Sequence, residues 1–269
     1  MVTFPPCKIN LGLHVINKRP DGFHNLETCF YPVPWTDVLE VIHSKTFGFS
    51  SSGNAIPGAW EHNLCVKAHR LLADQFSLSP ISIHLHKVIP MGAGLGGGSS
   101  DAAHVIRMLN GIFELNLSRD VMMKLAATIG SDTAFFIQDD PMLGKGRGDV
   151  LTDVTIDLAG KFLVLVHPDI HVSTADAYAR VTPAEPAVPL GDILKRPVGE
   201  WKDSLNNDFE YSVFEKYPVI ADLKDKLYSL GATYASMSGS GATVFGIFEK
   251  EFDAAIAFPG TTVWASKLH

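Results

Sequence analysis

The chain has 269 residues, 46% of them hydrophobic and 19% charged, a composition typical of a soluble globular protein with one large domain or two ordinary ones. Lys and Arg total 22 and Asp and Glu total 29, so the formal net charge is −7. This balance argues against nucleic acid or an anionic membrane as a partner, because both are bound through many basic side chains at once. A small anionic ligand stays compatible with it, since one pocket needs only a few local donors.

The three cysteines, Cys7, Cys29 and Cys65, show no CxxC spacing, so we expect neither a disulfide framework nor a zinc knuckle. No run approaches the ~18–20 apolar residues of a membrane-spanning helix. The first residues lack the basic and apolar regions of a signal peptide. We therefore predict a cytoplasmic protein.

Alternating apolar and polar residues predict a half-buried strand from Lys8 to Val15, with Lys8 and Asn10 on its polar face. Arg19-Pro20-Asp21-Gly22 predicts a turn, because Pro presets φ and Gly tolerates a positive φ. Further strands are expected from Phe23 to Tyr31 and from Val38 to Ile42.

Asn63 is expected to cap a helix that ends before Ser79-Pro80. The residues from Ile81 alternate again and predict a one-sided strand with His84 and His86 on its polar face. A helix is expected from about Ser100 to Leu109, and another between the cap Ser118 and the stop Gly130. The two histidines lack a third ligand at metal-like spacing, so no metal site is predicted.

Beyond Pro141 the segment 144–148 is rich in glycine and polar, which places a domain boundary near residue 150. We expect an N-terminal domain over 1–150 and a C-terminal domain over 151–269. The second contains a strand at 162–166, a proline-rich loop at 183–197, helices at 209–216 and 219–230, a glycine loop at 238–241 and a strand at 243–248. Helices and alternating strands in both halves predict an α+β architecture.

The segment from Gly92 to Ser100 has five glycines within its first seven residues and lies between a strand and a helix. Such a run usually lets backbone approach a ligand closely, and consecutive N–H groups at a helix start bind phosphate. The other interpretation is a tightly packed loop. The segment matches GxGxxG, but the one-sided strand before it argues against a dinucleotide fold, and no Lys follows the glycines as a P-loop requires.

Four motifs in order are similar to those of the GHMP kinase superfamily. Gly94 to Ser100 reads GLGGGSS and resembles its ATP-binding loop. The segments Lys8–Leu11 and Arg19–Thr28, the latter reading RPDGFHNLET, resemble the N-terminal signature of one member. Gly130–Phe136 and Met237–Ala242 resemble the GxDxxFF segment and the C-terminal glycine motif. The resemblance spans the chain from Lys8 to about Phe248.

This resemblance implies a two-domain fold with the active site in the cleft between the domains. It also implies a kinase that uses ATP and Mg²⁺ and phosphorylates the 2-hydroxyl of a cytidine diphosphate-linked polyol in the non-mevalonate isoprenoid route. No nucleic acid or membrane partner is expected, and the chain is expected to be a monomer or a homodimer. Phe23 replaces a common Tyr, Ser131 and Thr133-Ala134 vary the usual wording, and Asp149 stands where Glu is common.

The resemblance also assigns roles to residues. Asp132 is expected to act as general base at the acceptor hydroxyl, with Lys8 beside it, although an Asp in this setting is otherwise often a helix cap. The ATP-binding residues are expected to be Pro90, Met91, Gly92, Ala93, Gly94, Leu95, Gly96, Gly97, Gly98, Ser99 and Ser100, with Asn63, Leu64 and Lys87 at the adenine. The substrate-binding residues are expected to be Asn10, Phe23, His24, Thr174 and Tyr178, together with Asp132.

Plainer interpretations stay open for several of these residues: a helix cap for Asn63, a core position for Leu64 or Tyr178, and a strand end for Lys87. Three other functions also stay open. They are a kinase of the same fold for mevalonate or homoserine, a nicotinamide-dependent oxidoreductase, and a non-catalytic binding module.

Overall fold

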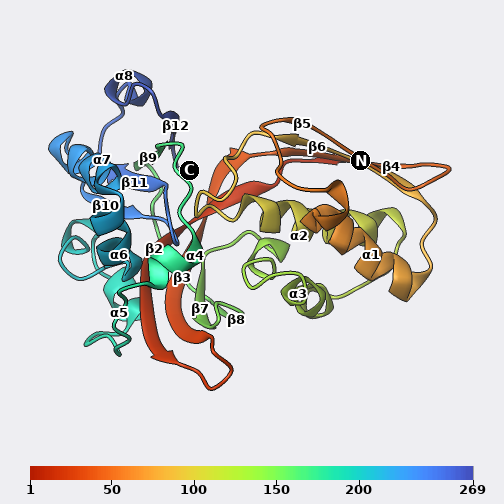
Figure 1. Cartoon of the computed structure of the whole chain (residues 1–269), viewed down its shortest axis with the longest axis horizontal. Helices are drawn as coiled ribbons and strands as arrows, with labels where there is room; N and C mark the ends of the chain where they lie inside the picture. The colour runs from red at the N-terminus through yellow and green to blue at the C-terminus, as the bar shows by residue number, and fades with distance from the viewer. Residues whose placement is uncertain (269) are drawn as a thin grey trace. The chain divides into compact units, whose positions relative to one another are not determined.

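The structure is a computed structural model and describes residues 1–268. The chain forms two compact units, each made of several segments (Figure 1). The first unit contains Met1–Lys8, Pro32–Met91 and Gly96–Asp140. The second contains Ile9–Tyr31, Gly92–Leu95 and the residues from Pro141 onward. No helix within residues 1–268 is long and apolar enough to cross a membrane.

The first unit is built on a four-stranded sheet in the order β1-β4-β6-β5. Its strands are β1 (Val2–Thr3), β4 (Val38–His43), β5 (Gly48–Gly53) and β6 (Ile81–Lys87). Strand β6 pairs antiparallel with β4 and parallel with β5. This mixed sheet is not the doubly wound parallel sheet that a dinucleotide fold requires, so the oxidoreductase alternative loses its structural basis.

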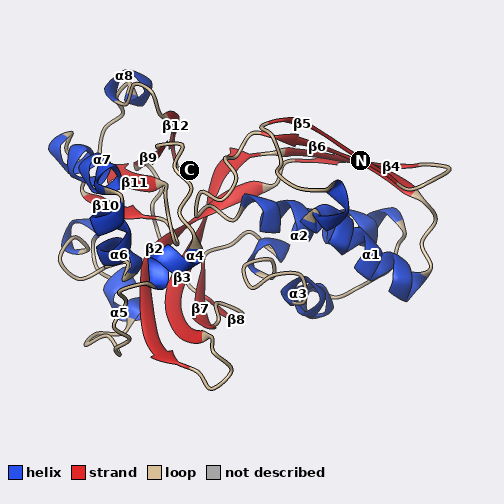
Figure 2. Cartoon of the chain, viewed as in Figure 1, coloured by secondary structure: helices blue, strands red, loops and turns tan. Residues whose placement is uncertain are grey.

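Helices cover one face of this sheet (Figure 2). They are α1 (Leu64–Phe76) and α2 (Gly97–Ile112), which pack against each other, and the unit also contains α3 (Arg119–Ala127), η1 (Trp60–His62) and η2 (Phe135–Ile137). The apolar residues of β6 are buried, whereas His86 is exposed, as the alternation predicts. The predicted caps are confirmed, since Asn63 Oδ1 accepts from Cys65 N and Ser118 Oγ from Val121 N.

The second unit holds most of a sheet in the order β2-β3-β7-β8. Its strands are β2 (Pro6–Lys18), β3 (His24–Thr36), β7 (Met142–Gly146) and β8 (Val150–Asp153). An antiparallel sheet in the order β10-β11-β9-β12 follows, with β9 (Phe162–His167), β10 (Tyr234–Met237), β11 (Val244–Phe248) and β12 (Thr262–Lys267).

The helices of the second unit are α4 (Thr174–Tyr178), α5 (Leu190–Leu194), η3 (Val198–Glu200), α6 (Phe209–Lys216), α7 (Pro218–Ser229) and α8 (Ala254–Ala257). An apolar core joins α6 and α7 to β9, β10 and β11, with residues such as Val164, Val213 and Val244 fully buried. The predicted helices at 209–216 and 219–230 and the strand that follows the 238–241 loop are confirmed.

The predicted half-buried strand is wrong in one respect, because β2 is buried on both faces. Asn10 and His14 are 2% and 8% exposed, although the alternation places them on a solvent face. They are buried because they find internal partners: Asn10 Nδ2 donates to Thr28 Oγ1 at 2.9 Å, and His14 Nδ1 lies 3.3 Å from Asp208 Oδ1.

Three further expectations need correction. The glycine-rich segment 144–148, expected as a polar domain boundary, is instead regular, since it forms the end of β7 and a turn in which Gly148 N donates to Lys145 O at 3.0 Å. The proline-rich loop contains the helix α5. Helix α2 begins at Gly97 rather than near Ser100, because Gly96 takes a left-handed φ of 70° and directs the glycines that follow into the first helical turn.

Candidate active site

The start of α2 presents backbone N–H groups as a predicted phosphate loop should. The first hydrogen bond within the helix runs from Ser100 N to Gly96 O at 3.0 Å. The N–H groups of Gly97, Gly98 and Ser99 precede that bond and have no carbonyl partner within the helix. Three such groups at the positive end of a 16-residue helix form a favourable site for an anion.

Lys8 and Asp132 lie together beside this helix start. Lys8 Nζ is 3.7 Å from Asp132 Oδ2, and the side chains are 4% and 34% exposed. Burial lowers the pKa of Lys8, and the Asp132 carboxylate opposes that shift. A Cβ added to Gly96 would lie 3.0 Å from the Phe136 ring and 3.2 Å from Lys8 Cε. The first unit thus brings the ammonium, the carboxylate and the glycine loop together.

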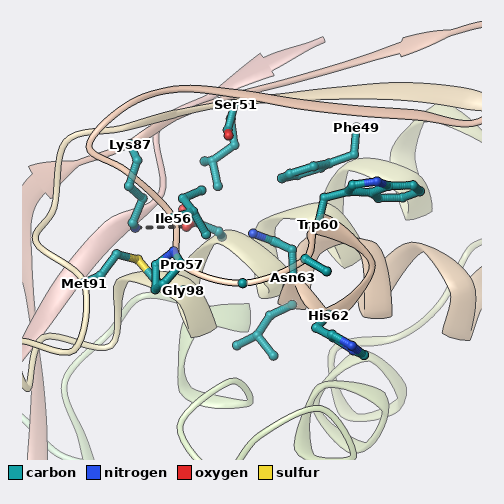
Figure 3. Close-up of a pocket in the computed structure, with 15 residues that line it drawn as sticks. Phe49, Ser51, Ile56, Pro57, Trp60, His62, Asn63, Lys87, Met91 and Gly98 are labelled. Carbon is teal, nitrogen blue, oxygen red and sulfur yellow. Dashed lines mark hydrogen bonds and ion pairs between the residues drawn. The ribbon is translucent and has the colours of Figure 1, made fainter.

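Five of the predicted ATP-binding residues line a cavity of about 260 Å³ in the first unit (Figure 3). They are Asn63, Leu64, Lys87, Met91 and Gly98. Lys87, Met91 and Gly98 lie at one end of the cavity, and Phe49 and Trp60 lie at the other (Figure 3). Sequence reasoning missed these two aromatic residues, because no motif surrounds them and β5 was not predicted.

Lys87 is not an ordinary strand-end lysine. Its Nζ forms ion pairs with the carboxylates of Asp37 and Asp101, the second at 3.0 Å. All three side chains are at most 2% exposed. A Cβ on Gly97 would lie 2.8 Å from Lys87 Nζ, so the ammonium sits beneath the first turn of α2. Burial alone lowers the pKa of Lys87, but the two carboxylates outweigh it and raise the pKa overall. Burial also raises the pKa of Asp101, to about 7.

The predicted base-binding residues lie in the second unit. The rings of His24 and Tyr178 stack with centroids 4.6 Å apart, and Tyr178 also contacts Phe209 edge-on at 4.7 Å. Tyr178 therefore belongs to the edge of the core and also offers contact to His24. Phe23 is 55% exposed, and the Arg147 guanidinium lies 5.4 Å from its ring centroid.

Two further predicted substrate residues have contrasting surroundings. Thr174 begins α4 and is exposed. Asn10 is buried, and its amide is committed to Thr28. Thr174 is therefore accessible, whereas burial and the hydrogen bond to Thr28 hold the Asn10 side chain in place.

The 238–241 loop packs against the glycine segment. Ser238 Oγ donates to Gly94 O at 2.9 Å, and Thr243 N donates to Ala93 O at 3.3 Å. A Cβ on Gly94 would stand 2.1 Å from Ser238 O. Ala93 and Leu95 are 1% exposed and contribute packing, Pro90 precedes them half-buried, and Gly92 lies against His171.

No cluster of three or more His, Cys, Asp or Glu suited to a metal ion occurs in the described part of the chain. His84 and His86 instead bond to serines of the neighbouring strand β5, with Ser52 Oγ 2.9 Å from His84 Nε2 and 3.0 Å from His86 Nδ1.

Comparison with known proteins defines the class. The model of the GHMP kinase N-terminal domain matches residues 63–139, and that of the GHMP kinase C-terminal domain matches residues 190–258. These are the models of a family of ATP-dependent kinases, and they cover the helix α2 site and the 238–241 loop.

The relatives narrow the assignment. The 4-diphosphocytidyl-2-C-methyl-D-erythritol kinase of Cytophaga hutchinsonii is 55% identical over 249 residues, 92% of each chain. The kinase of the same name from Bacteroides thetaiotaomicron is 49% identical over 99% of each chain. The chain belongs to the GHMP kinase family and, within it, to the group of 4-diphosphocytidyl-2-C-methyl-D-erythritol kinases.

Solved structures agree with this assignment. A crystal structure of 4-(cytidine 5'-diphospho)-2C-methyl-D-erythritol kinase has a TM-score of 0.85 and 30% identity, covering 98% of both chains. A homoserine kinase from Cytophaga hutchinsonii has a TM-score of 0.70 at 16% identity, which shows the shared fold alone.

Proposed function

We propose that this chain transfers the γ-phosphoryl group of ATP to the 2-hydroxyl of 4-diphosphocytidyl-2-C-methyl-D-erythritol. The observation that carries the proposal is the Lys8–Asp132 pair set against Gly96, at the helix end that offers free N–H groups. Phosphoryl transfer needs alignment and charge neutralisation more than covalent chemistry, and these groups supply both.

The proposed reaction places the ATP phosphates on the N–H groups of Gly97 to Ser99. The acceptor oxygen forms a bond to the γ-phosphorus, the bond from that phosphorus to the β–γ bridging oxygen breaks, and ADP leaves. The hydroxyl proton passes to Asp132, whose side chain is 34% exposed and therefore open to an alcohol. Lys8, buried behind it, offsets negative charge on the transferring group.

The adenosine part of ATP is assigned to the cavity lined by Asn63, Leu64 and Lys87, and the remaining loop residues from Pro90 to Gly96 are assigned to the phosphates. An aromatic wall at one end of the cavity and the glycine loop at the other suit a ligand with a flat base and a charged tail.

Cytosine recognition is assigned to Phe23, His24 and Tyr178, with Thr174 and Asn10 as polar neighbours. An exposed Phe beside a stacked His–Tyr pair suits a nucleobase, because a ring face stacks on it while a ring nitrogen meets the base edge. This pocket is what favours the cytidylyl substrate over mevalonate or homoserine.

Mg²⁺ is expected to enter with ATP. Mg²⁺ in phosphoryl-transfer sites is held largely by substrate phosphates and water, which fits a chain that builds no acidic cluster in its described part. The Ser100 hydroxyl is fully buried with no hydrogen-bond partner, and together with Ser99 it is the donor we assign to the ion or to a phosphate oxygen. The ion, when bound, neutralises phosphate charge.

We also propose that residues 1–150 and 151–269 are the two family domains and that the enzyme works in the cytoplasm as a monomer or homodimer. Its product would serve the non-mevalonate isoprenoid route.

The test is to incubate the purified chain with ATP, Mg²⁺ and the cytidylyl substrate and to follow the reaction by phosphorus NMR. We expect a new phosphomonoester signal and ADP. Parallel reactions with mevalonate and homoserine should give none. Product only with one of these alcohols would replace the substrate assignment, and no transfer to any of them would leave a binding module.

A further inference from the structure

We propose that Asn207 is a positioning residue that holds the second glycine loop, Ser238–Gly241, and through it the phosphate loop. Asn207 lies outside every motif that points to catalysis, one residue before Asp208, the N-cap of α6. The inference rests on the proposed nucleotide site, and it assigns a role to a residue that contacts neither substrate.

The amide of Asn207 is fully used. The residue is 3% exposed, and its Nδ2 donates to both Met237 O and Gly239 O at 2.8 Å. Its Oδ1 accepts from Phe209 N at 3.0 Å. A primary amide has two donor hydrogens, and both bind the backbone of the second glycine loop or the residue that enters it. Few other side chains can make both bonds from one buried point.

The second glycine loop transmits that position to the phosphate loop. Ser238, between the two residues that Asn207 holds, donates from Oγ to Gly94 O at 2.9 Å. The backbone contact is so close that no Cβ fits on Gly94. Gly94 is two residues before Gly96, the cap of α2, so a shift of Ser238 moves the chain that leads into the phosphate-binding turn.

The neighbours of Asn207 anchor it without reaching the loop tip. Asp208 Oδ2 accepts from Val15 N at 2.8 Å on β2. Glu210 Oε1 accepts from Met237 N at 2.8 Å, and Lys224 Nζ donates to Glu210 Oε2 at 2.6 Å. Asn207 is therefore the member of this segment that fixes the loop beyond Met237, and Asp208 is a matched control.

The experiment uses Asn207→Asp, which keeps the side-chain size but replaces the donating NH₂ group with an oxygen that faces two carbonyls. We expect kcat/KM for ATP to fall roughly 10- to 100-fold, because small misplacements remote from the chemistry have effects of that size. The KM for the cytidylyl substrate should change less than the KM for ATP. Asp208→Asn should leave kcat/KM for ATP within about threefold, since Asp208 contacts β2 at Val15, away from Lys8, and does not bond to the loop.

A double-mutant cycle with Ser238→Ala separates positioning from general weakening. If Asn207 acts through Ser238, the two changes are non-additive in ATP affinity, which calorimetry with a non-hydrolysable ATP analogue measures without an acceptor. Additive effects, or wild-type affinity in a folded Asn207→Asp protein, would overturn the proposal. If that variant does not fold, Ser238→Ala decides alone, and wild-type affinity in it is again the contrary result.

The binding readout keeps this proposal distinct from the proposed function. A wild-type chain that binds the analogue but does not phosphorylate the cytidylyl substrate would refute the substrate assignment and leave the Asn207 test valid. A chain that binds no nucleotide would overturn both.

Discussion

Lys8 Nζ lies 3.7 Å from Asp132 Oδ2, and the lysine is the buried member of the pair while the carboxylate keeps 34% of its side-chain surface exposed. The exposed member is the one that an incoming alcohol can reach. The buried member is the one whose charge is felt most strongly, because little water screens it.

Asp132→Asn tests whether Asp132 is the general base and Lys8 the residue that offsets charge. The amide cannot accept the hydroxyl proton, so kcat should fall by roughly 10²–10⁴, the usual contribution of a general base. Affinity for ATP should stay nearly unchanged, because we assign the phosphates to backbone N–H groups and not to Asp132. Steady-state kinetics and nucleotide calorimetry measure the two quantities. Turnover at the wild-type rate would mean that positioning and Lys8 account for the catalysis.

Phe23→Ala tests the proposed cytosine site. Base–aromatic stacking contributes about 1–3 kcal/mol, so the KM for the cytidylyl substrate should rise about 5- to 150-fold while the KM for ATP stays within about twofold. Phe4→Ala is the control, since Phe4 is similarly exposed, 60% against 55%, but has no assigned ligand. Equal changes in both KM values would remove Phe23 from the pocket.

Trp60 offers an optical test of the nucleotide cavity. Of four tryptophans, Trp60 is 46% exposed and lines the cavity, whereas Trp35 and Trp201 are 6% and 1% exposed. ATP should therefore change the intrinsic fluorescence, and Trp60→Phe should remove most of that change with little effect on kcat. Trp264→Phe should retain it. An undiminished fluorescence change in the Trp60→Phe variant would mean that adenine binds outside this cavity.

Gly94→Ala tests the contact between the glycine loops. A left-handed φ alone costs about 1–2 kcal/mol for a residue with a Cβ. Gly160 has a similar φ, 79° against 77°, but open space where a Cβ would stand. Gly160→Ala should lower the free energy of unfolding by only that amount, whereas Gly94→Ala should lower it further and weaken ATP binding. Denaturant titration measures the free energy of unfolding of both variants. Equal losses would mean that the 238–241 loop moves away from the added Cβ at no cost.

Asp101 predicts a pH dependence of stability. Its pKa is about 7 in the folded chain and near 4 for an ordinary Asp, so between these values the folded state holds a proton that the unfolded state has lost. Stability from this group is therefore present at low pH and is lost as pH rises through that window. Relative to Asp101→Asn, the wild type should lose roughly 1 kcal/mol per pH unit. Parallel stability curves would refute the shift.

The sequence predicted the helix caps, the one-sided strand β6 and the α+β class, because each depends on local spacing. It did not predict the burial of Asn10 and His14, since their partners Thr28 and Asp208 are distant along the chain. Strands β5 and β12 were missed for a related reason. Pairing with β6 and β9 makes them strands, and the glycines and serines of β5 have little strand preference of their own.

The site residues fall into the same two groups, those that local motifs identify and those that depend on contacts between distant segments. Motifs identified Lys8, Asp132 and the glycine loop, and the structure places these together. The cavity wall formed by Phe49 and Trp60 has no motif, and the burial of Lys87 between two aspartates depends on the β3–β4 junction, which carries Asp37, meeting α2 in space. Asn207 was missed because its partners are loop carbonyls, which leave no trace in side-chain patterns.

The Lys87 network also bears on which form of the nucleotide the site accepts. One ammonium beside two carboxylates has a net charge of −1 at a pH above the Asp101 pKa of about 7, where both aspartates are ionised, and this charge lies beneath the turn to which we assign the phosphates. A fully ionised triphosphate is repelled by such a surplus more than a magnesium-bound one. Free ATP should thus compete poorly with its metal complex, and inhibitors should gain more from the aromatic wall than from added phosphates.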